Sequence, residues 1–138
     1  MTGGSTDKES KIMANRINTE YAPAAIGPYS QGVELGNLVF VSGQLPIDPA
    51  TGAFASDDIQ GQTRQSLTNL SKILEEAGLT LGHVLKTTVF IQHMDDFAKM
   101  NEIYAEFFNC DVLPARSAVE VAKLPKGALV EIEAIASR

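Results

Sequence analysis

The chain is short of cysteine, of basic residues and of long apolar runs, and each shortage excludes a class of protein. Cys110 is the only cysteine, so no disulfide can form within the chain, which fits the reducing cytoplasm where we expect the protein to reside. The net charge is −6, with 11 basic residues and no basic cluster, which disfavours tight binding to a nucleic-acid backbone. No apolar stretch is long enough for a transmembrane helix, so we expect no membrane partner.

Motifs for the common cofactors and covalent mechanisms are also missing. The sequence has no G-x-G-x-x-G, no P-loop and no G-x-S-x-G elbow. His83 and His93 have no Cys or His partner at ligand spacing, so we expect no metal site. Cys110 has no activating motif beside it and is expected to be unreactive. An enzyme built on this chain would therefore work without a cofactor and without the usual nucleophiles.

The N-terminal segment differs from the rest of the chain in composition. Residues 1–15 are polar and lack the apolar core of a signal peptide, so we expect a disordered leader or extension, with Met13 as an alternative start. Residues 16–138 fit one compact domain, since 44% of the chain is apolar.

The next segment predicts a loop followed by a β-hairpin. Residues 17–28 mix Pro, Ala and Gly and predict an ordered loop. Residues 29–35 and 38–45 predict two strands, and the Gly36-Asn37 pair between them is typical of a tight hairpin turn.

The second of these strands has two unusual features. Ser42-Gly43 interrupts it, and glycine inside a strand often marks a bulge or the close approach of another group. Apolar residues also occur on both of its faces, at Leu38, Val39, Phe40 and Val41. That pattern favours burial of both faces of the sheet and hence an oligomer.

Helical periodicity predicts two helices that flank a strand over residues 85–94. The first runs from Ser56 or Asp57 to Ala77 and stops at Gly78; the second runs from a cap at Asp95 or Asp96 to about Phe108. Their expected inward faces are Ile59, Thr63, Leu67, Leu70, Leu74 and Ala77 in the first, and Phe97, Met100, Tyr104 and Phe107 or Phe108 in the second.

The last quarter of the chain predicts a second hairpin. Alternation over 117–122 and 129–136, joined by Leu-Pro-Lys-Gly, predicts two adjacent strands. Arg116, Ala118 and Glu120 share one face, and such a ribbon can form the floor of a small polar pocket with carboxylates of the second strand. Glu120 and Glu133 are expected to face water. If the register placed Glu131 opposite Glu120, the like charges would repel.

Taken together, the elements predict an α+β fold. The order ββαβ(β)αββ implies a mixed β-sheet with two helices packed on one face.

Four segments resemble the RidA family of reactive intermediate deaminases, also called the endoribonuclease L-PSP or translation-inhibitor family. They are IGPYSQGV at 26–33, FVSGQLP at 40–46, KTTVF at 86–90 and PARSAVEVAKLPKGALVEIEAIA at 114–136. The resemblance runs from about Asn18 to the C-terminus. It implies a chorismate-mutase-like α+β subunit in a homotrimer, with three clefts between neighbouring subunits and no cofactor.

The resemblance also implies an activity: hydrolysis of 2-aminoacrylate-type enamines and imines to 2-keto acids and ammonia. Matched position by position, it makes Arg116 the anchor of the substrate carboxylate, and Glu131 and Tyr29 the groups that orient water or move protons. The remaining substrate-binding positions are Ser42, Gly43, Ala118 and Asn101.

The residue types suit this chemistry, although other interpretations remain open. An arginine can hold a carboxylate through two parallel bonds, which orients a small planar imino acid better than a lysine would. Arg116 in another context would be a surface ion-pair partner, Tyr29 could be a core residue, and Glu131 could be an exposed acid. Asn101 either lines the cleft or braces the second helix. Ala118 replaces a cysteine found in many relatives, which removes thiol chemistry at that position.

Two other functions compete with imine hydrolysis. The same cleft could bind 2-keto acids or other small carboxylates without turnover, as a regulatory protein. A ribonuclease or translation-inhibitor role, named for some relatives, is disfavoured by the acidic charge and by the lack of a histidine pair.

Overall fold

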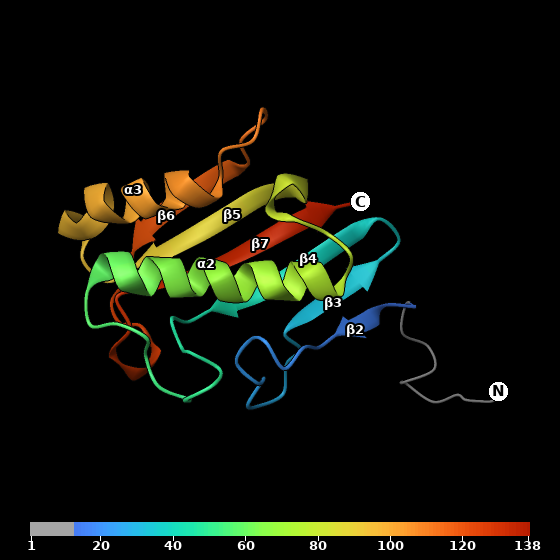
Figure 1. Cartoon of the computed structure of the whole chain (residues 1–138), viewed down its shortest axis with the longest axis horizontal. Helices are drawn as coiled ribbons and strands as arrows, with labels where there is room; N and C mark the ends of the chain where they lie inside the picture. Colours follow the sequence, from blue (N-terminus) through green and yellow to red (C-terminus); the bar gives the residue numbers. More distant parts are fainter. Residues whose placement is uncertain (1–12) are drawn as a thin grey trace.

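The structure is a computed structural model that describes residues 13–138 (Figure 1). Its strands are β2 (Asn15–Ile17), β3 (Gly32–Leu35), β4 (Leu38–Gln44), β5 (Val84–Ile91), β6 (Ala115–Glu120) and β7 (Val130–Ser137), and its α-helices are α2 (Ile59–Glu76) and α3 (Phe97–Phe107). The strands form one six-stranded sheet in the order β2-β3-β4-β7-β5-β6. Both helices lie on the same face of this sheet in Figure 1, which confirms the predicted α+β architecture.

The N-terminal hairpin follows the prediction. β3 and β4 pair antiparallel and are joined by a turn that contains Gly36. The φ of Gly36 is +59°, a conformation that residues with a β-carbon disfavour. Strand β2, which the sequence did not reveal, pairs with β3 and begins at Asn15, inside the predicted leader. Residues 1–12 of that leader lie outside the described residues.

Helix α2 begins at Ile59, slightly later than the predicted start at Ser56 or Asp57, and it ends beside the predicted stop at Gly78. The Asp58 carboxylate accepts a hydrogen bond from the Gly61 amide at 2.7 Å, and Gly78 ends the helix with a φ of +80°. The predicted inward face is confirmed, since all six of its residues are buried: Ile59, Thr63, Leu67, Leu70, Leu74 and Ala77.

Helix α3 also begins where predicted, but without the expected cap. Asp96 occupies the capping position and its side chain makes no capping bond. Met100, Tyr104 and Phe108 are buried, as expected. Neither helix within residues 13–138 is both long and apolar enough to cross a membrane.

The predicted C-terminal hairpin is wrong. β6 and β7 do not pair with each other, because β5 lies between them, parallel to β6 and antiparallel to β7. The connecting residues 121–129 instead pass over the end of β5, where the Gln92 side chain donates to the carbonyls of Val121 and Ala122 and accepts from the Leu124 amide. Glu120 and Glu131 are therefore not opposite each other.

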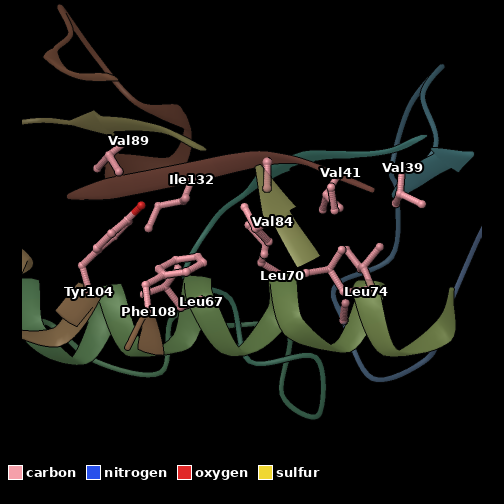
Figure 2. Close-up of a cluster of buried hydrophobic side chains, with 14 of the residues drawn as sticks. Val39, Val41, Leu67, Leu70, Leu74, Val84, Val89, Tyr104, Phe108 and Ile132 are labelled. Atoms are coloured by element: carbon pink, nitrogen blue, oxygen red, sulfur yellow. The ribbon is translucent and has the colours of Figure 1, made fainter. Parts of the chain in front are cut away.

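The core lies between the helices and one face of the sheet, as Figure 2 shows for Leu67, Leu70 and Leu74 of α2 against the strands. On β4, Val39 and Val41 point into this core, whereas Leu38 and Phe40 remain about 40% exposed. The opposite face of the sheet therefore carries apolar side chains with no cover in the single chain, and it is called the open face below.

Candidate active site

Arg116 and Glu131, the two charged residues of the predicted site, lie on opposite faces of the sheet. Arg116 pairs in register with Thr87, which is fully buried beneath the helices. Glu131 lies between Val130 and Ile132, both of which point into the core, so its side chain projects from the open face. The prediction that one ribbon carries both groups into a common pocket is therefore wrong for a single chain.

The Arg116 guanidinium is held against helix α3. Its Nη1 donates to Asn101 Oδ1 at 2.6 Å, and its central carbon lies 4.7 Å from the ring centroid of Tyr104 and 5.4 Å from that of Phe97. We call Phe97 and Tyr104 the aromatic bracket. Ala118 follows on the same face of β6 and packs against the core. These residues form what we call the arginine half of the predicted site.

No carboxylate neutralises Arg116 among residues 13–138. The salt bridges of arginine in this part of the chain are Arg64 with Glu106 at 3.0 Å and Arg138 with Glu34 at 3.1 Å. Within the described residues, Arg116 is therefore not part of a surface ion pair. Its charge is available for an external anion.

Tyr104 is itself fixed in place. Its hydroxyl shares a buried hydrogen bond of 2.7 Å with Thr87 Oγ1, and its ring packs on Phe108 with centroids 4.6 Å apart. Burial raises the pKa of the Tyr104 hydroxyl further above physiological pH, where tyrosine is neutral in any case. The ring thus presents a fixed, uncharged face to the guanidinium.

Four other predicted site residues gather in a second place, on the open side. Tyr29, Ser42, Gly43 and Glu131 line one cavity of about 490 Å³, which we call the glutamate half of the site. Its remaining walls are mostly apolar and consist of Pro23, Ala24, Ile26, Leu45, Ile47, Pro125 and Lys126. Neither Arg116 nor Asn101 belongs to this cavity.

Glycine at position 43 allows Glu131 to approach the backbone of β4. The strand has a register irregularity between Val41 and Gln44, and a β-carbon at Gly43 would overlap the Glu131 carboxylate. Both predicted uses of this glycine, as a bulge and as a point of close approach, are confirmed. Burial, with a smaller contribution from the negative charge of Glu133, raises the pKa of Glu131.

The other two residues of this half are connected through the backbone. The Ser42 hydroxyl donates to the Ser30 carbonyl at 2.6 Å and so fixes the segment that carries Tyr29. Tyr29 is 54% exposed, which rules out the core-tyrosine interpretation. Ser42 therefore braces Tyr29 as well as lining the cavity.

Comparisons with known proteins place this chain in a family. Residues 19–138 match the family described as endoribonuclease L-PSP. The chain is 56% identical to a Salmonella typhimurium protein named 2-iminobutanoate/2-iminopropanoate deaminase, over 91% of this chain and 99% of that one. The chain belongs to the RidA family.

Two further RidA-family relatives extend this result. A RutC family protein of Pyrococcus horikoshii is 56% identical over 90% of this chain and 98% of that one. The crystal structure of E. coli TdcF with bound serine superposes with a TM-score of 0.87 at 51% identity, covering 90% of this chain and 98% of that one.

The sequence did not reveal that the aromatic bracket contacts Arg116. Phe97 and Tyr104 were predicted only as core residues of the second helix, and Asn101 was considered separately. Their spacing contains the missing signal, because positions 97, 101 and 104 share one face of a helix.

Among residues 13–138, no three His, Cys, Asp or Glu side chains cluster in a way that could hold a metal ion.

Proposed function

We propose that this RidA-family protein is a cofactor-independent hydrolase that converts 2-imino acids, and the enamines in equilibrium with them, to 2-keto acids and ammonia. The observation that carries this proposal is Arg116, a guanidinium held by neutral groups with no carboxylate partner in residues 13–138. Such a group is suited to bind the carboxylate of a small organic anion.

The names of close relatives support the same reaction. The Salmonella protein, 56% identical, is named as a deaminase of 2-iminobutanoate and 2-iminopropanoate. The TdcF structure contains serine, which is a small amino acid with a carboxylate like that of the proposed substrate. These relatives favour imine hydrolysis over the regulatory and ribonuclease alternatives. We place the reaction in the cytoplasm, where the single Cys110 would stay reduced.

A complete site requires two copies of the chain. The arginine half lies on the helix-covered face and the glutamate half on the open face, so one sheet separates them within a subunit. A homotrimer whose open faces point inward would cover the exposed Leu38 and Phe40 and bring the arginine half of one subunit to the glutamate half of the next.

Binding begins with the carboxylate of the imino acid. Two parallel bonds from the Arg116 guanidinium would orient the planar substrate, and Asn101, which already accepts one N–H, fixes the remaining donors. The small Ala118 leaves room beside the anion. Ser42 and Gly43 of the neighbouring subunit would form the opposite wall.

Hydrolysis then requires one water and three proton transfers. Glu131 accepts a proton from water while the water oxygen forms a bond to C2 of the protonated imine. The Tyr29 hydroxyl orders the nitrogen or the water. Glu131 then passes this proton to the nitrogen of the tetrahedral intermediate, the C2–N bond breaks as ammonia leaves, and Glu131 takes the remaining hydroxyl proton as the carbonyl forms. The raised pKa of Glu131 makes it a better base than a solvated glutamate.

A coupled assay tests the proposal. The purified protein is added to a threonine dehydratase in amine-free buffer, and the appearance of 2-ketobutyrate is followed. We expect acceleration by the native chain, none by Arg116→Ala, and full acceleration by Arg64→Ala, which removes an exposed arginine that is paired with Glu106. Failure of the native protein to accelerate 2-ketobutyrate formation would refute the proposal. If 2-ketobutyrate nevertheless bound through Arg116, the binding-protein alternative would replace it.

A further inference from the structure

Helix α3 presents one face to the guanidinium of Arg116. Phe97, Asn101 and Tyr104 are spaced at i, i+4 and i+7, and all three contact Arg116. Asn101 binds a single N–H, whereas the two rings face the planar cation. The helix therefore restrains the guanidinium by three contacts, none of which carries a charge.

The deeper of the two rings is anchored from behind. Tyr104 is buried, its hydroxyl is bonded to Thr87, and Thr87 is also the register partner of Arg116 in the parallel pair of β5 and β6. The ring is thus tied to the strand that neighbours the strand of Arg116. A shift of α3 relative to the sheet would break this link.

We propose that Phe97, Tyr104 and Thr87 are positioning residues for the reaction: the aromatic bracket, tied to the sheet by the Thr87–Tyr104 hydrogen bond, holds the Arg116 guanidinium in the orientation that receives the substrate carboxylate. This inference rests on the proposed function. Arginine has a long side chain with large rotamer entropy, and ordering it before the anion arrives lowers the cost of binding.

A second arginine shows why the bracket must be neutral. Arg64 also lies over an α3 ring, with its central guanidinium carbon 5.9 Å from the ring centroid of Phe107. Unlike Arg116, it forms a salt bridge, in which Nη2 lies 3.0 Å from Glu106 Oε1. A carboxylate beside Arg116 would hold the side chain equally well and would compete with the substrate for the same N–H groups. Aromatic faces attract a cation without occupying its hydrogen-bond donors.

The matched pair Phe97→Leu and Phe107→Leu tests the proposal. Both remove a half-buried aromatic ring of α3 that faces an arginine, but only the first affects Arg116. We expect Phe97→Leu to weaken 2-ketobutyrate binding by about three- to tenfold in calorimetry and to raise KM by a similar factor with little change in kcat. Phe107→Leu should leave both constants near those of the native protein, and Phe97→Tyr should restore them.

Thr87→Val tests the link behind Tyr104. This change removes the hydroxyl partner of Tyr104 without altering any group that contacts Arg116. We expect a rise in KM of about two- to fivefold without loss of kcat, because the ring remains but is less well fixed.

Guanidinium order can be measured without any ligand. Nitrogen-15 relaxation of the Arg116 Nε–Hε group should report a rigid side chain in the native protein and in Phe107→Leu, and a mobile one in Phe97→Leu. Equal order in all three proteins would overturn the inference, as would equal KM changes in the two leucine variants. If the native protein failed to hydrolyse any imine, the proposed function would fall, and the relaxation and 2-ketobutyrate binding would still decide whether the bracket positions Arg116.

Discussion

The two halves of the proposed site are built in contrasting ways. In the arginine half, a charged side chain on an edge strand is ordered by neutral groups from one helix, namely Phe97, Asn101 and Tyr104. In the glutamate half, a charged side chain is pressed against the backbone at Gly43 and lies near a second acid, Glu133. The first side chain is held by neutral contacts, whereas the charged form of the second is disfavoured by burial.

This difference matches the tasks proposed for the two groups. A binding group must keep its charge and its orientation, so aromatic faces and an amide suit it. A group that exchanges protons works best when its pKa is close to the working pH, so burial and a like charge suit it. The halves also lie on opposite faces of one sheet, so each can be altered without touching the other.

The largest expected effect is complementation between two inactive variants. Arg116→Ala and Glu131→Gln should each be inactive. When the two variants are mixed, unfolded and refolded together, the mixture should recover about a quarter of native activity. In a trimer with sites between subunits, each mixed assembly contains one site with both halves intact. Activity is measured by the coupled 2-ketobutyrate assay.

A control mixture contains Arg116→Ala with the double variant Arg116→Ala/Glu131→Gln, which cannot form an intact site in any arrangement and should stay inactive. If the mixture of the two single variants also remained inactive although mixed oligomers were present by native mass spectrometry, the site would not be shared between subunits.

Gly43→Ala should affect only the glutamate half. The added β-carbon would overlap the Glu131 carboxylate, and because this side chain is flexible it would swing away at a cost in unfolding free energy of about 1 kcal/mol. Activity should fall about 10²-fold because the base is displaced. Binding of 2-ketobutyrate through Arg116 should change much less.

The matched control is Gly82→Ala. A β-carbon there would meet only Thr80 Oγ1, at 3.4 Å, which is an ordinary contact. Native activity in this variant and a large loss in Gly43→Ala are expected. Equal activity of the two variants would show that Glu131 does not depend on the space at Gly43.

Glu131→Gln should make the protein more stable at pH 7. The pKa of Glu131 is raised in the folded state by burial and then by Glu133. The unfolded carboxyl, with a pKa of about 4.3, therefore loses its proton first, and stability falls as pH rises through the folded pKa. Thermal melts should show a higher Tm for the variant at pH 7 and no gain near pH 4. A gain of equal size at both pH values would contradict this account.

The smallest expected effect is a shift of the pH profile in Glu133→Gln. Removing the neighbouring negative charge lowers the pKa of Glu131, although burial, the larger cause, remains. The acidic limb of kcat/KM should therefore move by a fraction of a pH unit to lower pH, with the plateau unchanged. Glu120→Gln, whose carboxylate instead accepts from the Met94 amide, is the control and should leave the limb in place.

Local signals in the sequence predicted most of the fold correctly. Gly78 ends helix α2, Gly36-Asn37 forms the first hairpin turn, and Gly43 lies at both a bulge and a close contact. Each of these features depends on residues near one another in the chain or on the conformational needs of one residue, which sequence patterns report directly.

The sequence alone therefore determined the elements other than β2, the inward faces of the helices, the family and the candidate residues. Only the tertiary structure decided which strands are neighbours and which charged groups share a face: β5 separates β6 from β7, and the sheet separates Arg116 from Glu131. Alternation shows that a strand has two faces, but it contains no information on which face the helices cover or which strand inserts between two others. Those choices depend on packing between segments far apart in the chain.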